Sequence, residues 1–132
     1  LIKYKEEYKD DLKLIAYCLL PNHFHFVIHN KGTGTQISDF MKKLQGGCAI
    51  WHRVKYPLDA GAKLPFFEGR FKAKMIHDET YLEQCLAYVN FNAVKHKLVD
   101  NIDYYPWTSY HQITDKDKIE KHRDLILDEL EL

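Results

Sequence analysis

The sequence predicts an α+β domain built on an antiparallel β-hairpin and amphipathic helices. Two mostly apolar segments of strand length, 14–20 and 23–29, are separated only by the turn-forming pair Pro21-Asn22. Apolar residues then recur at helical spacing in a segment that begins near Thr35 and again between Asp78 and His96. These observations predict a hairpin followed by two principal helices.

Length and composition limit the possible classes of protein. The 132 residues are enough for one domain with a real core, and the apolar content of 45% and aromatic content of 14% are typical of a folded globular chain. We find neither an apolar run of about 18 residues nor a signal peptide, so no membrane association is expected. Cys18, Cys48 and Cys85 are widely spaced in apolar surroundings, which favours reduced thiols in a cytoplasmic protein.

The predicted hairpin contains candidate metal ligands. Successive side chains of a strand point to opposite faces, so His23 and His25 lie on one face together with Val27, while Phe24 and Phe26 point into a core on the other. Two imidazoles about 6–7 Å apart along a strand can hold one divalent ion and leave coordination positions open. A strand face that is simply polar and exposed to solvent gives the same His-x-His pattern. The apolar flanks predict a central strand, where two histidines need partners such as a metal or an anion.

The other elements are expected in the following order. Residues 1–11 form the end of a helix, and 31–35 form a loop from which Thr35 or Ser38 caps the next helix. Apolar positions of that helix are Ile37, Phe40, Met41, Leu44, Cys48 and Trp51, and Lys42 and Lys43 lie on its other side. Residues 66–76 read as a strand, and 78–96 as a helix with a stripe of Leu82, Leu86, Val89 and Ala93. Residues 105–110 read as an aromatic turn in which Trp107 fills the core, with a base-stacking platform as the alternative. We expect one domain over 1–132, with a terminal amphipathic helix at 115–132.

Positive charge is concentrated in the middle of the chain, although the net charge is zero. Residues 31–97 contain eleven Lys and Arg against six Asp and Glu, and residues 115–132 contain four against seven. In the predicted strand 66–76, Arg70, Lys72 and Lys74 alternate with apolar residues, so this face is either a solvated edge or a track for phosphates.

The late helix offers candidates for a reactive group. Tyr88 and Asn92 are one helical turn apart at the edge of the apolar stripe, so both side chains can reach over the sheet. The chain has nine tyrosines, and simple packing is the alternative for any of them.

The run AYCLLPNHFHFVIH resembles the signature of the HUH single-tyrosine transposases, most closely the REP-associated tyrosine transposases, which are IS200-like. Further matches follow in the same order: FFEGRFKAKMI, ETYLEQCLAYVNFNAVKHKLV and YPWTSY. Together they cover most of residues 14–110.

The resemblance implies a ferredoxin-like fold and a metal-dependent enzyme that cuts and rejoins single-stranded DNA with hairpins. His23, His25 and Asn92 would bind Mg²⁺ or Mn²⁺, and Tyr88 would attack the DNA to give a 5′-phosphotyrosine intermediate. Arg70, Lys72, Lys74, Lys42 and Lys43 are the candidates for holding the DNA backbone. A nucleoid-associated location is expected, and a homodimer remains open.

The sequence departs from the family pattern at two points, and two other functions remain as alternatives. The family usually has Asn-Pro-Val where this chain has Asn92-Ala93-Val94, and it opens with a strand before the first helix that is not visible here. A non-catalytic DNA-binding relative is one alternative. A histidine-triad nucleotide hydrolase is another, although that chemistry needs a histidine at Val27.

Overall fold

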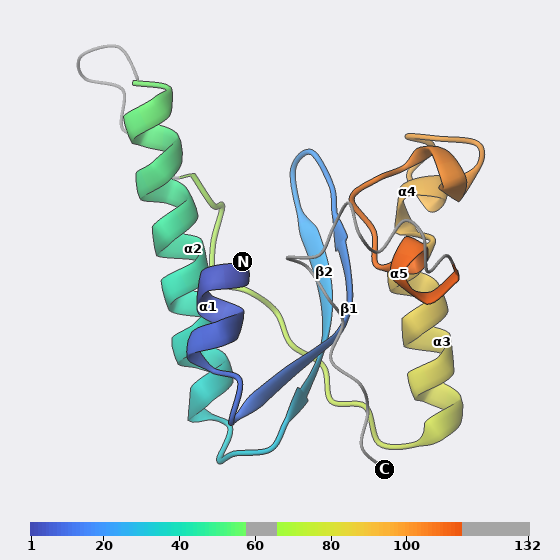
Figure 1. Ribbon diagram of the computed structural model, residues 1–132, viewed down its shortest axis with the longest axis horizontal. Helices are drawn as coiled ribbons and strands as arrows, with labels where there is room; N and C mark the ends of the chain where they lie inside the picture. The colour runs from blue at the N-terminus through green and yellow to red at the C-terminus, as the bar shows by residue number, and fades with distance from the viewer. Residues whose placement is uncertain (58–65, 115–132) are drawn as a thin grey trace.

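The computed structural model describes residues 1–57 and 66–114 (Figure 1). The expected terminal helix at 115–132 lies outside the described residues. The elements are α1 (Ile2–Glu7), β1 (Leu12–Leu19), β2 (Phe24–Asn30), α2 (Thr35–Lys55), α3 (Glu79–Asn90), α4 (Asn92–Lys95), the short 3₁₀ helix η1 (Ile102–Tyr104) and α5 (Tyr110–Thr114). No helix among the described residues is long and apolar enough to cross a membrane.

The predicted hairpin is confirmed. β1 and β2 pair antiparallel, and the turn at Pro21-Asn22 is closed by the Leu20 N–H, which donates to the His23 carbonyl over 2.8 Å. A β-bulge lies between Leu14 and Ala16, where two steps on β1 oppose a single step on β2. Beyond the bulge, Ala16 pairs with Val27 and Cys18 pairs with His25, so two small side chains share a face with the histidine strand.

Helices cover both faces of the hairpin. In Figure 1, α1 and α2 lie on one side of the two strands and α3 lies on the other. Phe24, Phe26 and Ile28 pack against a cluster built from Leu12 and from Phe40, Met41 and Leu44 of α2, whereas Val27 is buried in a second cluster with Val89 and Ala93. The alternation along β2 therefore supplies two cores, one on each face.

The sheet is smaller than the sequence analysis predicted. Within 1–57 and 66–114 it contains β1 and β2 alone, so the detailed ferredoxin-like topology is not confirmed and the prediction of a central histidine strand is wrong for the part described. Residues 66–76 do not form the predicted strand, because they run beside the hairpin without pairing to it. Their apolar side chains divide between the two cores: Phe71 packs with α2 and Ile76 with α3.

The predicted helix is confirmed as α2, but its N-cap and the burial of its last turns differ from the prediction. Its N-cap is Gly34, at a φ of 87° and without a side-chain cap, so neither Thr35 nor Ser38 caps it. Gly47 allows close approach of α1, because a Cβ placed there would lie 2.5 Å from the Tyr4 hydroxyl. Trp51 is 59% exposed, since α2 continues past the hairpin (Figure 1).

The late helix is interrupted, although its predicted apolar stripe is confirmed. α3 ends at Asn90 and α4 begins at Asn92, with Phe91 between them. The Asn90 carbonyl accepts a hydrogen bond from the Thr108 hydroxyl (2.9 Å), and Val94 N–H instead bonds to the carbonyl of Phe91 (3.1 Å). A side chain inserted at this point accounts for the break.

The segment 107–109 is held on the free edge of β1. Leu19 N–H donates to the Trp107 carbonyl (2.8 Å), and Ser109 N–H donates to the Tyr17 carbonyl (2.9 Å). Trp107 is 52% exposed, so its predicted place in the core is wrong; Thr108 and Ser109 are buried instead. The Ser109 hydroxyl accepts from Tyr17 N–H (3.1 Å) and donates to the Asn90 side-chain oxygen, which ties the edge of β1 to the end of α3.

This buried hydroxyl yields a stability prediction. Ser109→Ala leaves the Tyr17 N–H and the Asn90 oxygen without their shared partner, and each unpaired buried group costs about 1–3 kcal/mol. We expect urea denaturation to show a free energy of unfolding lower by at least about 2 kcal/mol, the lower limit for two such groups. Ser38→Ala, at an exposed position of α2, is the control and should change it by less than about 0.5 kcal/mol. Equal stability of the two variants would contradict the assigned role of Ser109.

Candidate metal and tyrosine site

A cluster of three imidazoles lies at the turn end of β2. The ring centroids of His23 and His25 are 5.2 Å apart, and those of His23 and His96 are 4.9 Å apart. One potential ligand nitrogen from each ring lies within 4.8 Å of the other two. The structure therefore confirms that His23 and His25 face the same way, and it adds a third histidine from the end of α4.

The local sequence explains how α3 comes so close to this face. Beside the histidines, β1 presents Ala16 and Cys18, and both are completely buried. Their small volume lets Val89 and Ala93 pack directly on the hairpin. Tyr88, next to Val89 on α3, is consequently carried to His25, with ring centroids 5.5 Å apart.

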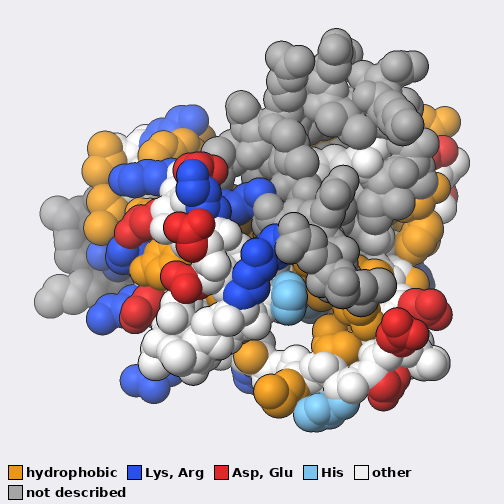
Figure 2. All heavy atoms as spheres, turned by 60° about the horizontal axis from the view of Figure 1, so that its bottom comes forward, with side chains coloured by type: hydrophobic (Ala, Val, Ile, Leu, Met, Phe, Trp, Pro, Cys, Tyr) orange, Lys and Arg blue, Asp and Glu red, His pale blue; other side chains and the backbone are white. Residues whose placement is uncertain are grey.

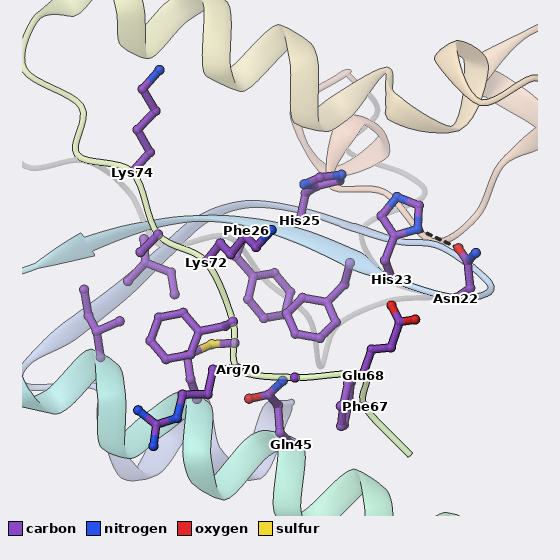
Figure 3. Close-up of a pocket in the computed structure, with 17 residues that line it drawn as sticks. Asn22, His23, His25, Phe26, Gln45, Phe67, Glu68, Arg70, Lys72 and Lys74 are labelled. Atoms are coloured by element: carbon purple, nitrogen blue, oxygen red, sulfur yellow. Dashed lines mark hydrogen bonds between the residues drawn. The ribbon is translucent and has the colours of Figure 1, made fainter. Parts of the chain in front are cut away.

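Asn22 orients His23. Its side-chain oxygen lies 2.6 Å from Nδ1 of His23, the contact drawn as a dashed line in Figure 3. A carbonyl oxygen can only accept, so Nδ1 carries the proton and Nε2 keeps its lone pair. Contacts of this kind commonly fix the ring of a metal-binding histidine.

The surroundings keep the first two imidazoles neutral. The pKa of His25 is lowered by burial and, to a smaller degree, by the nearby His23, His96 and Lys95. The pKa of His23 is lowered by burial and then by His96. At neutral pH both rings are thus unprotonated and can donate a lone pair to a cation.

Tyr88 contacts this site through His25, and Asn92 is buried one helical turn after Tyr88. The Tyr88 side chain is 43% exposed, and the Lys95 ammonium lies 4.3 Å from its ring centroid, which puts a positive charge beside the phenol. Asn92 is completely buried; its amide nitrogen is 3.5 Å from the Tyr88 carbonyl, and its Oδ1 has no hydrogen-bond partner. An unpaired buried oxygen of this kind is a suitable donor for a cation.

The basic residues of 66–76 border a groove that reaches the β2 histidine pair from the α2 side of the hairpin. Arg70, Lys72 and Lys74 line a groove of about 430 Å³ together with His23 and His25. In Figure 3, Lys74 extends toward α3, where its ammonium lies 5.4 Å from the Tyr81 ring, whereas Arg70 lies on the side of α2. The basic side chains therefore line the groove from the α2 side and from the α3 side. They do not form the single basic face that a strand would give.

The two lysines of α2 are placed differently. Lys42 is exposed, and Lys43 forms an ion pair with Glu7 and lies over the ring of Tyr8. On the face shown in Figure 2, Lys and Arg side chains gather around α1 and α2 with acidic side chains among them. The proposed contact of Lys42 and Lys43 with DNA stays a prediction.

Three residues of the site were not singled out from sequence: His96, Lys95 and Asn22. Helical spacing could have indicated His96. Tyr88, Asn92 and His96 follow one another at intervals of one helical turn. The residue next to it, Lys97, adopts a φ of 57°, which no sequence pattern indicated.

Comparison with known proteins gives a family match and a curated relative. A family model described as "Transposase IS200 like" matches residues 2–92. A curated protein of Haemophilus influenzae (strain Rd), described as "Putative REP-associated tyrosine transposase", is 27% identical over 108 residues. That match covers 74% of this chain and 58% of the relative, so the chain spans less than two thirds of the relative's length. No solved structure is significantly similar to the chain.

Proposed function

We propose that this chain, which belongs to the IS200-like transposase family, cuts and rejoins single-stranded DNA with Tyr88 as its nucleophile. The observation that carries the proposal is the contact of Tyr88 with His25, at 5.5 Å between ring centroids. A half-exposed phenol from α3 and a histidine pair from β2 meet there although they are far apart in sequence.

The residues present suit a divalent cation. His23 and His25 offer neutral imidazoles, and the buried Oδ1 of Asn92 has no other partner, so these three are the proposed ligands. When bound, the ion would neutralise a phosphate oxygen and stabilise the leaving 3′-oxygen.

Tyr88 would carry out the covalent step. Its Oη gives up a proton and forms a bond to phosphorus, while the bond from phosphorus to the 3′-oxygen breaks. The electron pair of that bond leaves with the 3′-oxygen, which takes up a proton to become a free 3′-OH. The 5′-phosphate remains on the tyrosine. Because the number of phosphoester bonds is unchanged, another 3′-OH can reverse the step without ATP.

The chain's positive charges would position the DNA. Lys95 stands beside the Tyr88 ring, where an incoming phosphate must lie. Arg70, Lys72 and Lys74 border the groove that leads to the histidines. We propose single-stranded DNA carrying a hairpin as the substrate; the family and the name of the Haemophilus relative support a DNA substrate.

The nucleophile is tested by Tyr88→Phe, which removes one oxygen and keeps the ring. With Mn²⁺ and a labelled hairpin oligonucleotide, the parent protein should form a covalent adduct that survives a denaturing gel, and Tyr88→Phe should form none. Binding of the same oligonucleotide should persist. The matched control is Tyr81→Phe, two turns earlier on α3, which should leave the adduct intact.

Two results would count against this assignment. An adduct in Tyr88→Phe would place the nucleophile elsewhere. Binding without an adduct in the parent protein, on every hairpin tried, would favour the non-catalytic DNA-binding alternative.

The groove is tested by the salt dependence of binding. Changing Arg70, Lys72 and Lys74 together to Gln should weaken single-stranded DNA binding, and the slope of log K against log salt should become shallower by roughly 0.7 for each lost phosphate contact. Changing Lys3, Lys5 and Lys9, in and just after α1, to Gln removes the same charge at residues that do not line the groove and is the control. Equal slopes in the two triple variants would show that the groove does not hold the backbone.

A further inference from the structure

The backbone around His96 is fixed by the way α4 ends. His96 is the C-cap residue, and its N–H bonds to the Asn92 carbonyl over 3.0 Å. Leu98 N–H then bonds to the Ala93 carbonyl (3.0 Å) and Lys97 N–H to the Val94 carbonyl (2.9 Å), with Lys97 at a φ of 57°. This is the hydrogen-bond pattern of a Schellman motif, which turns the chain sharply after the cap residue. His96 is thus fixed as the C-cap residue of α4, and its ring centroid lies 4.9 Å from that of His23.

The distances between the three imidazoles suit a shared ion. Their ligand nitrogens lie within 4.8 Å of one another. Metal–nitrogen bonds of about 2.0–2.1 Å place the nitrogens around one ion about 3–4 Å apart. Modest rotations of the side chains are enough to close that difference, and the exposed ring of His96 has room to make them.

Three nitrogen donors favour transition-metal ions, the class to which Mn²⁺ belongs, over Mg²⁺. Mg²⁺ prefers oxygen ligands and retains its waters. Imidazole suits transition metals, with affinity rising from Mn²⁺ through Co²⁺ and Ni²⁺. We propose that His96 is a third nitrogen ligand, and that it makes this site select a first-row transition-metal ion over Mg²⁺. The inference rests on the proposed function, in which His23 and His25 hold the ion.

The added ligand is compatible with catalysis. A site with three protein ligands still has open positions for a phosphate oxygen or a water. The inference concerns His96 and is separate from the role of Asn92, which lies one turn earlier.

Cobalt binding tests the inference without any DNA reaction. Metal-free parent protein, His96→Ala and His77→Ala are titrated with Co²⁺, followed by visible absorption, and with Mg²⁺, followed by calorimetry. His77 is exposed and outside the cluster, so its variant controls for the loss of a surface histidine. The parent and His77→Ala should bind Co²⁺ more tightly than Mg²⁺. His96→Ala should bind Co²⁺ more than about tenfold less tightly, with a changed absorption spectrum and nearly unchanged Mg²⁺ affinity.

Several outcomes would overturn the inference: equal Co²⁺ affinity in the parent and His96→Ala, equal loss in His77→Ala, or no preference of the parent for Co²⁺ over Mg²⁺. Should His96→Ala fail to fold by circular dichroism, the histidine ring resonances of the parent decide: three shifted by Co²⁺ support the inference, and two contradict it. The covalent adduct is scored separately. A selective Co²⁺ site in a parent protein that forms no adduct supports the role of His96 and contradicts the strand-transfer proposal. An adduct in the parent, together with unchanged Co²⁺ binding in His96→Ala, supports strand transfer and contradicts the role of His96.

Discussion

The alternation of side chains along β2 is the constraint on which the rest of the structure depends. Residues from Phe24 to Ile28 must serve a core on each face of a two-stranded hairpin, because α2 covers one face and α3 the other. The phenylalanine face packs with α2. On the opposite face, Val27 is buried under α3, and the half-buried histidines His23 and His25 lie at the turn end of the strand. A shift of register by one residue would exchange these faces and remove both the core and the site.

The second constraint on the site is the residue at which α3 ends. The buried segment at Thr108 and Ser109 bonds to both the backbone and the side chain of Asn90, and the helix is interrupted immediately afterwards. Tyr88 lies before the interruption, whereas Asn92 and His96 follow it on α4. The same segment covers the free edge of β1, which would otherwise be open to pairing with another chain. One short stretch therefore protects the sheet and sets the position of the candidate nucleophile.

The sequence predicted those parts that follow from local periodicity. The hairpin, its turn at Pro21-Asn22 and the stripe from Leu82 to Ala93 were correct, because each depends on patterns within a few residues. Residues 66–76 alternate as a strand does, yet a strand also needs a partner, and no sequence pattern reveals whether one is beside it. Trp107 was misplaced for a similar reason: its size suggested the core, but the pairing of 107–109 with β1 buries its smaller neighbours. His96 continues the four-residue spacing of Tyr88 and Asn92, but it was missed because spacing alone does not show that the end of α4 lies against the β2 histidines.

The central claim is that the β2 histidines hold a metal ion next to Tyr88. The most direct test is ¹⁹F NMR of the protein labelled with 3-fluorotyrosine, in which the Tyr88 signal among the nine tyrosines is assigned by its absence from Tyr88→Phe. Substoichiometric Mn²⁺, a paramagnetic ion, should broaden the Tyr88 signal strongly in the parent and leave it sharp in a His23→Ala, His25→Ala double variant. A Tyr88 signal that stays sharp while the parent binds Mn²⁺, or one that broadens equally in the double variant, would contradict the claim.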